Sequence, residues 1–411
     1  MLQANINNFK LYQVQQLESN RGRADMFVNS FINGTNWADE VTAIDRLAKL
    51  TKEDIVTFVN KYLTDQNYAV IYKKQGQNPN EKKMAKPTIT PIVMNRDVAS
   101  DFLKEIQNSN VKPIEPVFLD FKKDLSQLKA KSGIPVLYKQ NTSNDLFQLI
   151  YVFDMGNNND KALGTAFDYI DYLGTSDMTP EQVKSEFYRL ACNFRVSPGN
   201  ERTYVVLSGL NENMPEAMKL FEKLMADAQV NKEAYTNMVA DILKSRKDAK
   251  LNQMQNFRRL MNYGMYGPKS PATNILTETE LQTMDPQELT DRIHNQNSYK
   301  HRIMYYGPTS EKELLAIINK NHQAPKKLKE IPVGNEFPRL ETPVTKVLIS
   351  PYEAKQIYMT QLSNRGEKFD PMIEPSRQMY NEYFGGGMNS IVFQEMPWKD
   401  FINIFEHSFS I

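Results

Sequence analysis

Apolar residues follow two different periods along this chain, one typical of helices and one typical of strands. Helical spacing of apolar positions covers residues 9–30, 51–62, 161–173, 179–191, 215–228 and 232–261. Alternating or continuous apolar runs, which predict strands, cover residues 67–73, 136–139, 147–154, 194–196, 203–209 and 301–307. Because strands come in pairs and helices in pairs, the pattern predicts an α+β fold rather than a doubly wound parallel sheet.

Two local signals add detail to this pattern. Residues 141–145 are polar and separate the strands at 136–139 and 147–154, so we expect these two strands to be neighbours joined by a turn. The helix at 179–191 begins with Thr179-Pro-Glu-Gln, in which the side chains of Thr179 and Gln182 are spaced to form a capping box. The sequence thus predicts where this helix begins.

A capped helix that leads into a strand occurs twice, at residues 51–72 and 285–306. Thr51 and Asp285 are the predicted N-caps, and Pro286 suits the first helical position of the second copy. At an offset of 234 (285 minus 51), the copies pair apolar residues without a gap: Ile55 with Leu289, Val59 with Ile293, and Val70 with Met304. The helical runs 9–30 and 238–263 upstream also correspond. This ordered set indicates a duplicated domain.

Two stretches lack any periodicity and are rich in turn-forming and charged residues. Residues 76–91 contain Gly76 and three prolines, and residues 325–343 contain four prolines and several lysines. We interpret both as linkers, which divide the chain into a short first block, a large middle block and a short last block.

The composition is that of an ordinary globular protein. The 411 residues suffice for two to three domains, with 40% apolar and 24% charged residues. The 50 basic and 49 acidic residues leave almost no net charge, which gives no indication of nucleic acid or anionic lipid as a partner. No run approaches the roughly 18 apolar residues of a membrane span. Residues 1–8 lack the basic and apolar regions of a signal peptide.

Cys192 is the only cysteine, so no disulfide can form within the chain. It follows Tyr188-Arg-Leu-Ala, and we place it on an apolar helix face. The role that this position favours is a small buried hydrophobe rather than a nucleophile.

Residues 380–396 read Tyr-Asn-Glu-Tyr-Phe-Gly-Gly-Gly-Met-Asn-Ser-Ile-Val-Phe-Gln-Glu-Met, a helix that runs into glycines and then into an apolar helix start. This stretch resembles the opening of an even-numbered domain in the M16 (insulinase/pitrilysin-like) zinc metallopeptidases. In that family an Arg and Tyr motif that holds the substrate follows. Here Met396 is followed by Pro397-Trp-Lys-Asp-Phe401, and the sequence ends at Ile411.

The resemblance covers nearly the whole chain and implies an α+β fold of M16 peptidase-like (LuxS/mitochondrial processing peptidase-like metallohydrolase) domains, with a mixed or antiparallel sheet packed with helices. It implies the C-terminal part of a second domain at 1–75, a linker at 76–115, a third, non-catalytic domain at 116–325, and a linker with the truncated start of a fourth domain at 326–411. Residues 345–349 and 356–362 would be the first strands of that fourth domain. We therefore expect a non-catalytic C-terminal half, truncated at both ends.

M16 chemistry needs His-x-x-Glu-His on a helix, where two histidines hold zinc and the glutamate activates the bound water. None of the four histidines, His294, His301, His322 and His407, forms this motif. When Gly174-Thr175 is matched to the end of the family's motif helix, the degenerate metal-motif positions are Thr165, Asp168 and Tyr169. We expect no zinc and no catalytic residue in this chain, since zinc belongs to the catalytic half of the family.

Four further features of the sequence have plainer interpretations than a functional site. Gly385, Gly386 and Gly387 form a candidate substrate-side glycine loop, but without the lysine of a P-loop or the strand of a Rossmann turn they favour a tight loop or close helix approach over nucleotide binding. The basic residues of 244–250 favour a solvated helix face over a nucleic-acid patch. His294 and His301 favour surface or satisfied core roles, and Glu406-His407 lies beyond the family pattern.

The resemblance implies a segment of an M16-like zinc metallopeptidase, the non-catalytic half that closes the chamber and helps to hold the peptide substrate by edge-strand pairing. No hydrolysis is expected by the chain alone. The implied partners are a catalytic M16 half, in cis or in trans, and the peptide substrate of the parent, with no nucleic acid and no membrane span. Two alternatives stay open: a scaffold or assembly subunit of M16 fold, and an inactive-half subunit whose zinc half is a separate chain. The sequence gives no compartment, and a periplasmic or cell-envelope parent is compatible with the resemblance.

Overall fold

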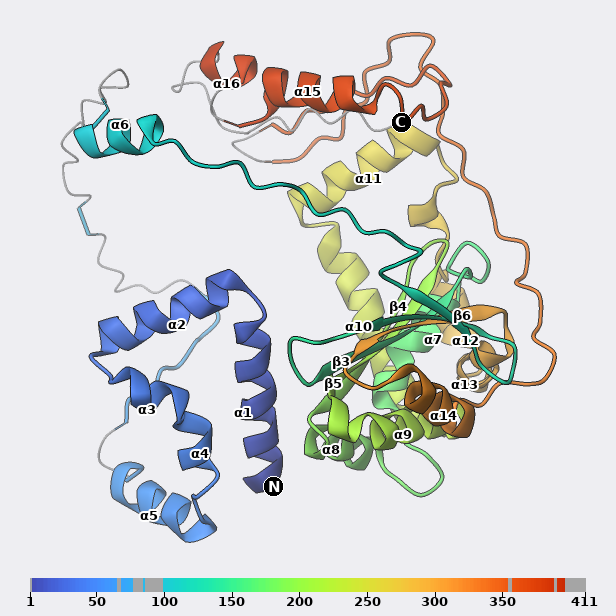
Figure 1. Cartoon of the computed structure of the whole chain (residues 1–411). Helices are drawn as coiled ribbons and strands as arrows, with labels where there is room; N and C mark the ends of the chain where they lie inside the picture. Colours follow the sequence, from blue (N-terminus) through green and yellow to red (C-terminus); the bar gives the residue numbers. More distant parts are fainter. Residues whose placement is uncertain are drawn as a thin grey trace.

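The structure is a computed structural model that describes residues 2–64, 68–76, 84–85, 99–353, 357–387 and 390–395. At its centre lies a six-stranded sheet (Figure 1). Its strands are β1 (Ser126–Lys129), β2 (Pro135–Gln140), β3 (Leu146–Phe153), β4 (Cys192–Pro198), β5 (Thr203–Leu210) and β6 (His301–Gly307). The strand order is β1-β2-β6-β3-β5-β4, with β2 and β6 parallel and all other neighbours antiparallel. The predicted α+β class with a mixed sheet is thus confirmed.

The expectation that β2 and β3 are neighbouring strands is wrong, because β6 lies between them. Ile303 of β6 is opposite Val136 on one side and Tyr151 on the other. The polar residues 141–145 form a wide loop instead of a tight turn: the Asn141 side chain accepts from the N–H of Ser143, and the Asn141 N–H donates to the Gly307 carbonyl at 2.8 Å. This loop leaves room for one strand between β2 and β3.

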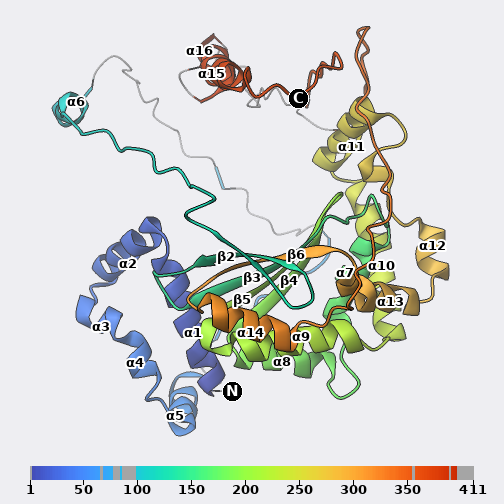
Figure 2. The ribbon, with the colours of Figure 1, turned by 45° about the vertical axis from the view of Figure 1, so that its right-hand side comes forward.

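Helices cover one face of the sheet, and α8, α9 and α14 lie along it in Figure 2. The covering helices are α7 (Leu163–Tyr169), α8 (Pro180–Arg189), α9 (Met214–Asp227), α13 (Gln287–Asn295) and α14 (Glu311–Asn321). The most buried helix, α9, presents an apolar stripe that includes Met218, Phe221 and Leu224 to the sheet. Tyr151 and Leu207 meet this stripe from the strands, and one continuous core results.

The remaining helices lie outside this layer. They are α1 (Leu2–Leu17), α2 (Asn20–Asn33), α3 (Trp37–Val41), α4 (Ala43–Leu47), α5 (Lys52–Tyr62), α6 (Asp101–Asn108), α10 (Lys232–Ala249), α11 (Gln253–Tyr266), α12 (Glu278–Thr283), α15 (Glu374–Gly385) and α16 (Ile391–Glu395), with short 3-10 turns η1 (Ile170–Tyr172), η2 (Asn211–Asn213), η3 (Pro271–Thr273) and η4 (Gln296–Ser298). In the part of the chain that the structure describes, no helix has the length and apolarity needed to cross a bilayer.

Several predicted helix ends are found, and others are corrected. The capping boxes of Thr51 with Asp54 and of Thr179 with Gln182 both form. The continuous helix expected at 9–30 is broken at Ser19, whose hydroxyl caps α2, and the one expected at 232–261 is broken at Asn252, which caps α11. In each case a short polar side chain that can bond the backbone starts a new helix. The second predicted N-cap is displaced by one residue: Pro286, not Asp285, is the N-cap of α13, and the Asp285 carboxylate accepts from the Gln287 N–H at 3.1 Å.

Three predicted strands do not form. Residues 68–73 and, in the last block, residues 345–349 and 357–362 have no strand structure, while residues 67 and 356 lie outside the described residues. A strand needs a neighbour for its backbone groups, and these segments have none among the described residues. Residues 340–353 and 357–364 instead run beside α11, where the Leu340 N–H donates to the Met265 carbonyl at 2.7 Å and Tyr358 packs on Phe257.

The two predicted linkers differ in what the structure describes. Residues 77–83 and 86–98 of the first linker region lie outside the described residues, as do Pro397 to Ile411. The second linker, 325–343, lacks regular structure as expected, but it is attached to the core. The Lys329 N–H donates to Ser298 and its carbonyl accepts from Lys300, and the Asn335 N–H donates to Asn158. Leu328 and Ile331 pack against the main core.

Candidate functional site

The outer edge of the sheet at β4 is open. Within the described chain β4 pairs with β5 alone, so its other side presents backbone groups that no strand uses. Asn193 and Arg195 of β4 are exposed, whereas Phe194 and Val196 are partly buried on the helix side of the sheet. An extended peptide could pair with such an edge through its backbone.

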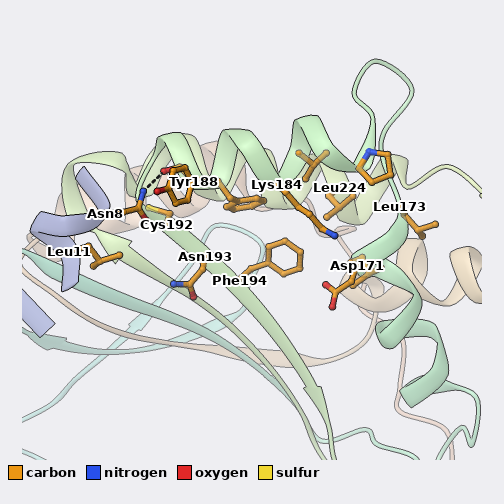
Figure 3. Close-up of a pocket in the computed structure, with 14 residues that line it drawn as sticks. Asn8, Leu11, Asp171, Leu173, Lys184, Tyr188, Cys192, Asn193, Phe194 and Leu224 are labelled. Carbon is orange, nitrogen blue, oxygen red and sulfur yellow. Dashed lines mark hydrogen bonds between the residues drawn. The ribbon is translucent and has the colours of Figure 1, made fainter. Parts of the chain in front are cut away.

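A cavity of about 320 Å³ lies beside this edge, between β4 and α8 (Figure 3). Its lining comes from α1, from the segment around η1, from α8, β4 and α9: Asn8, Leu11, Ile170, Asp171, Leu173, Pro180, Val183, Lys184, Phe187, Tyr188, Cys192, Asn193, Phe194 and Leu224. Elements that are far apart in the sequence therefore build one site. Its walls are mainly apolar, as in many binding pockets.

The floor of the cavity is aromatic. The rings of Phe187 and Phe194 are 5.0 Å apart between centroids, and Phe194 lies 5.2 Å from Phe221 in the core. At the mouth, Lys184 extends from α8 in the direction of Asp171 (Figure 3). This arrangement suits an apolar side chain that inserts between charged groups at the rim.

The first helix closes one end of the cavity. The Asn8 amide donates to the Tyr188 carbonyl at 2.7 Å, and the Tyr188 hydroxyl donates to the Asn5 side chain at 2.5 Å. Leu11 packs with Leu146, Ala191 and Leu210 in a small apolar cluster. The N-terminal helices are thus attached to the β4 edge through α1 and α8.

Cys192 lines the cavity but is not on a helix, so its expected place on a helix face is wrong. The helix α8 ends at Arg189, Ala191 adopts a left-handed backbone with φ 46°, and Cys192 begins β4. Opposite it, a Cβ on Gly209 would lie 2.4 Å from the Ala191 carbonyl oxygen, so only glycine fits there. Burial raises the pKa of the Cys192 thiol to about 12. The predicted role as a small buried hydrophobe is confirmed.

The positions that the resemblance assigned to a degenerate metal motif all lie on α7. Thr165 is half-buried and Asp168 is exposed, and partial desolvation followed by the charge of Asp171 raises the pKa of the Asp168 carboxyl. Tyr169 is buried; its hydroxyl donates to the Asn231 carbonyl at 2.6 Å and accepts from the Asn231 N–H at 2.8 Å. These three side chains thus do not converge on one point. Among the described residues no group of three or more His, Cys, Asp or Glu could hold a metal ion.

A buried carboxylate, Glu222 on α9, is the centre of a polar network that sequence reasoning missed. It is 1% exposed and accepts four hydrogen bonds, at distances of 2.6–3.1 Å, from Tyr151 Oη, His322 Nδ1, Asn297 Nδ2 and Gln323 N. All four acceptor positions of an ionised carboxylate are used. Desolvation, and then the charge of Glu222, raise the pKa of Tyr151 well above its usual value. The sequence does contain one indication of this network, because Glu222 is a single acidic residue within the apolar stripe of α9.

Two histidines extend this network. His322 Nε2 and His301 Nε2 are 2.9 Å apart, and His301 Nδ1 is 2.7 Å from the Tyr299 carbonyl. Each Nδ1 lies beside an oxygen atom, of Glu222 and of Tyr299, and the two Nε2 atoms contact each other, so every ring nitrogen of the pair has a partner. Burial lowers the pKa of His301 to about 4, so this ring is neutral at pH 7. The predicted satisfied core role of His301 is confirmed.

The other candidates from the sequence lie elsewhere. His294 Nε2 contacts the Ala228 carbonyl at 3.1 Å, and His407 lies outside the described residues. Gly385 ends α15, Gly386 is its C-cap, and Gly387 has a φ of 79° in the turn toward α16. Both views place α15 far from α7, which carries the degenerate motif positions (Figures 1 and 2). The structure therefore does not bring the glycine run and the degenerate motif positions together.

Comparisons with known proteins identify relatives by structure only. No family model matches the chain, and no curated protein sequence matches it. The solved structures that it resembles include the periplasmic protease PqqL from Escherichia coli, with 13% sequence identity and a TM-score of 0.47, covering 82% of this chain and 40% of that one. This chain therefore spans less than half the length of PqqL.

Two further solved structures are each covered over 67% of their length and match 66% of this chain. One is the peptidase M16 inactive domain from Pseudomonas fluorescens, with 15% identity and a TM-score of 0.46. The other is a protease from Helicobacter pylori, with 11% identity and a TM-score of 0.48. The M16 peptidases, which the sequence resembles, are thus also represented among the solved structures that this α+β chain resembles.

Proposed function

We propose that this chain is the non-catalytic half of an M16-like zinc metallopeptidase and that it helps to hold an extended peptide along the outer edge of β4. The observation that carries the proposal is the open edge of β4 beside an apolar cavity of about 320 Å³. Backbone pairing with an edge strand gives affinity without demanding a particular sequence. The cavity adds a preference, because one apolar side chain of the peptide would insert against Phe187 and Phe194.

The partner that we propose is a zinc-binding M16-like half, in cis or in trans, which this chain would cover so that the two enclose the substrate. Exposed apolar residues on α5 support a partner of this kind: Ile55, Val56 and Val59 are 43%, 47% and 39% exposed. Contiguous apolar surface of this sort is typical of protein contacts. In this assembly the zinc and the hydrolysis belong to the other half.

Peptide binding tests the first part of the proposal. A fluorescein-labelled peptide of about ten residues, with leucine at every second position, is titrated with the full chain and followed by fluorescence anisotropy. The same peptide with N-methylated amides cannot donate backbone hydrogen bonds, and we expect its affinity to fall by roughly tenfold or more. Lys184→Trp, which places a bulky ring at the cavity mouth, should weaken binding similarly, whereas Lys219→Trp on the exposed side of α9 should not.

Three outcomes would contradict the proposal at different points. Equal binding of the methylated and unmethylated peptides would rule out edge pairing. No binding of either peptide would favour the scaffold or assembly alternative. Cleavage of the peptide by the purified chain, with zinc added, would show that the chain is not a non-catalytic half.

A further inference from the structure

Of the duplicated unit indicated by the sequence, the strand expected at residues 68–73 does not form, but two of its helices begin and end at corresponding positions. The N-caps Ser19 of α2 and Asn252 of α11 are 233 residues apart (252 minus 19). The C-caps Gly34 and Gly267 have the same separation (267 minus 34), and both have positive φ values, 64° and 75°, although their ψ values differ, 25° and −156°. The helices α2 and α11 therefore occupy corresponding positions in the two copies. The residues that cover their C-terminal turns can be compared directly.

In the second copy the C-terminal turn of α11 is covered by an extended segment. The Leu340 N–H donates to the Met265 carbonyl at 2.7 Å. A Cβ on Gly267 would lie 3.4 Å from the Leu340 side chain, and a Cβ on Gly264 would lie 3.5 Å from Leu348. The segment that follows Leu340 thus packs over the last turn of the helix.

In the first copy no described residue covers the same place. A Cβ on Gly34 would meet no atom of the described residues within 4 Å. Ile32, which corresponds to Met265, is 71% exposed, and Phe31, which corresponds to Gly264, is 88% exposed. The C-terminal end of α2 is therefore an exposed apolar surface at the position where α11 is covered.

A segment suited to this site lies within the chain itself. Residues 109–120 have no regular structure, and Ile114 and Val117 are each 95% exposed. The run Ile114-Glu-Pro-Val117 resembles Leu340-Glu-Thr-Pro-Val344, the run that covers α11. In each copy this run follows the duplicated unit and precedes the next block.

We propose that residues 112–119 form a strap that closes over the C-terminal turn of α2, with Ile114 against Gly34 and its N–H on the Ile32 carbonyl. Lys112 would then lie near the negative end of the α2 dipole, which favours a cation. The eight residues between Val117 and Ser126 span up to roughly 30 Å when extended, and this length sets the reach of the strap from the start of β1. A closed strap would cover exposed apolar surface and fix the N-terminal helices relative to the sheet.

Hydrogen exchange of the full chain, read by mass spectrometry, tests the strap. We expect the amides of residues 112–118 to exchange at least about tenfold more slowly than in a free peptide of that sequence. Peptides spanning residues 340–344 provide the internal reference for a docked run. Phe31→Asp should abolish the protection of 112–118 and leave that of 340–344 unchanged, whereas Leu63→Asp, at a residue that is 71% exposed, should change neither.

Ile114→Asp provides a second test that does not depend on the folding of α2, because Ile114 is exposed in the open form. It should remove the protection of 112–118 while α1 and α2 keep theirs. Exchange of 112–118 at the free-peptide rate in the unmodified chain would overturn the proposal. So would protection that grows with protein concentration, because it would show that a second copy covers α2.

Discussion

Glu222, His322 and His301 form a chain of hydrogen bonds that crosses the core from α9 to β6. Its members are buried, yet each polar atom has a partner, so the network avoids the cost of orphaned polar groups. It also reaches the segment after α14, since the Gln323 N–H donates to Glu222 at 3.1 Å. The network therefore connects the core to the segment that follows α14.

Stability should fall as the pH decreases from about 6.5 to about 4, because His301 must stay neutral in the folded protein. Burial lowers its pKa from 6.5 to about 4, so the unfolded chain binds the proton more readily across this interval. Above pH 6.5 both states are neutral and the contribution is constant. Over the whole interval the loss is roughly 3 kcal/mol, and urea unfolding at pH 7 and pH 4 measures it.

A pair of variants separates this effect from the general response to acid. His301→Gln should be less stable than the unmodified chain at pH 7 and should lose less stability between pH 7 and pH 4. His294→Gln should keep the full pH dependence. The pKa of Glu280 is lowered to about 2, chiefly by the hydrogen bond from Lys161, so its contribution to stability is lost mainly below pH 4.5. Parallel pH curves for the unmodified chain and His301→Gln would show that His301 is not the titrating group.

At the scale of elements, the two copies of the duplicated unit differ in what covers them. The helix α13 packs against α7 and α9, and its residues Leu289 and Ile293 are fully buried. The corresponding residues of α5, Ile55 and Val59, are 43% and 39% exposed. The same helical pattern thus serves a core in one copy and a surface in the other.

This difference predicts unequal costs for matched substitutions. Leu289→Ala should destabilise the protein by about 2–5 kcal/mol, because it removes buried carbons and leaves a cavity. Ile55→Ala should cost less than about 1 kcal/mol, since water already reaches this side chain. Chemical unfolding followed by circular dichroism measures both. An Ile55→Ala cost as large as that of Leu289→Ala would show that α5 is covered in solution.

Helices were easier to predict from the sequence than the sheet, because their signals are local. Thr179 and Gln182 lie three residues apart and form the predicted capping box. The position of β6 between β2 and β3 depends on residues more than 140 positions apart, as in the pairing of Tyr151 with Ile303, and no local pattern shows it. The cavity at β4 was missed for the same reason, since Leu11, Phe187 and Leu224 come from three separate helices.

At the scale of the whole molecule, the connections that join the first and last blocks to the central sheet differ in how they are attached to the core. Residues 68–74 after α5 are exposed and form no regular structure. Residues 325–335 also lack regular structure, but they lie on the core. The Lys329 backbone bonds to Ser298 and Lys300, and Ile331 packs on the core. Sequence composition alone made these two connections look equivalent.

Limited trypsin digestion should distinguish the two connections. We expect the bond after Lys74 to be cut at least about tenfold faster than the bond after Lys329, because cleavage at Lys329 requires its backbone to leave Ser298 and Lys300 first. Mass spectrometry of the fragments over time gives both rates. Glu222→Leu removes both carboxylate oxygens, including the acceptor that holds the Gln323 N–H, so it should speed the cut at Lys329 and leave the cut at Lys74 unchanged. An initial cut at Lys329 in the unmodified chain would show that this connection is not docked on the core.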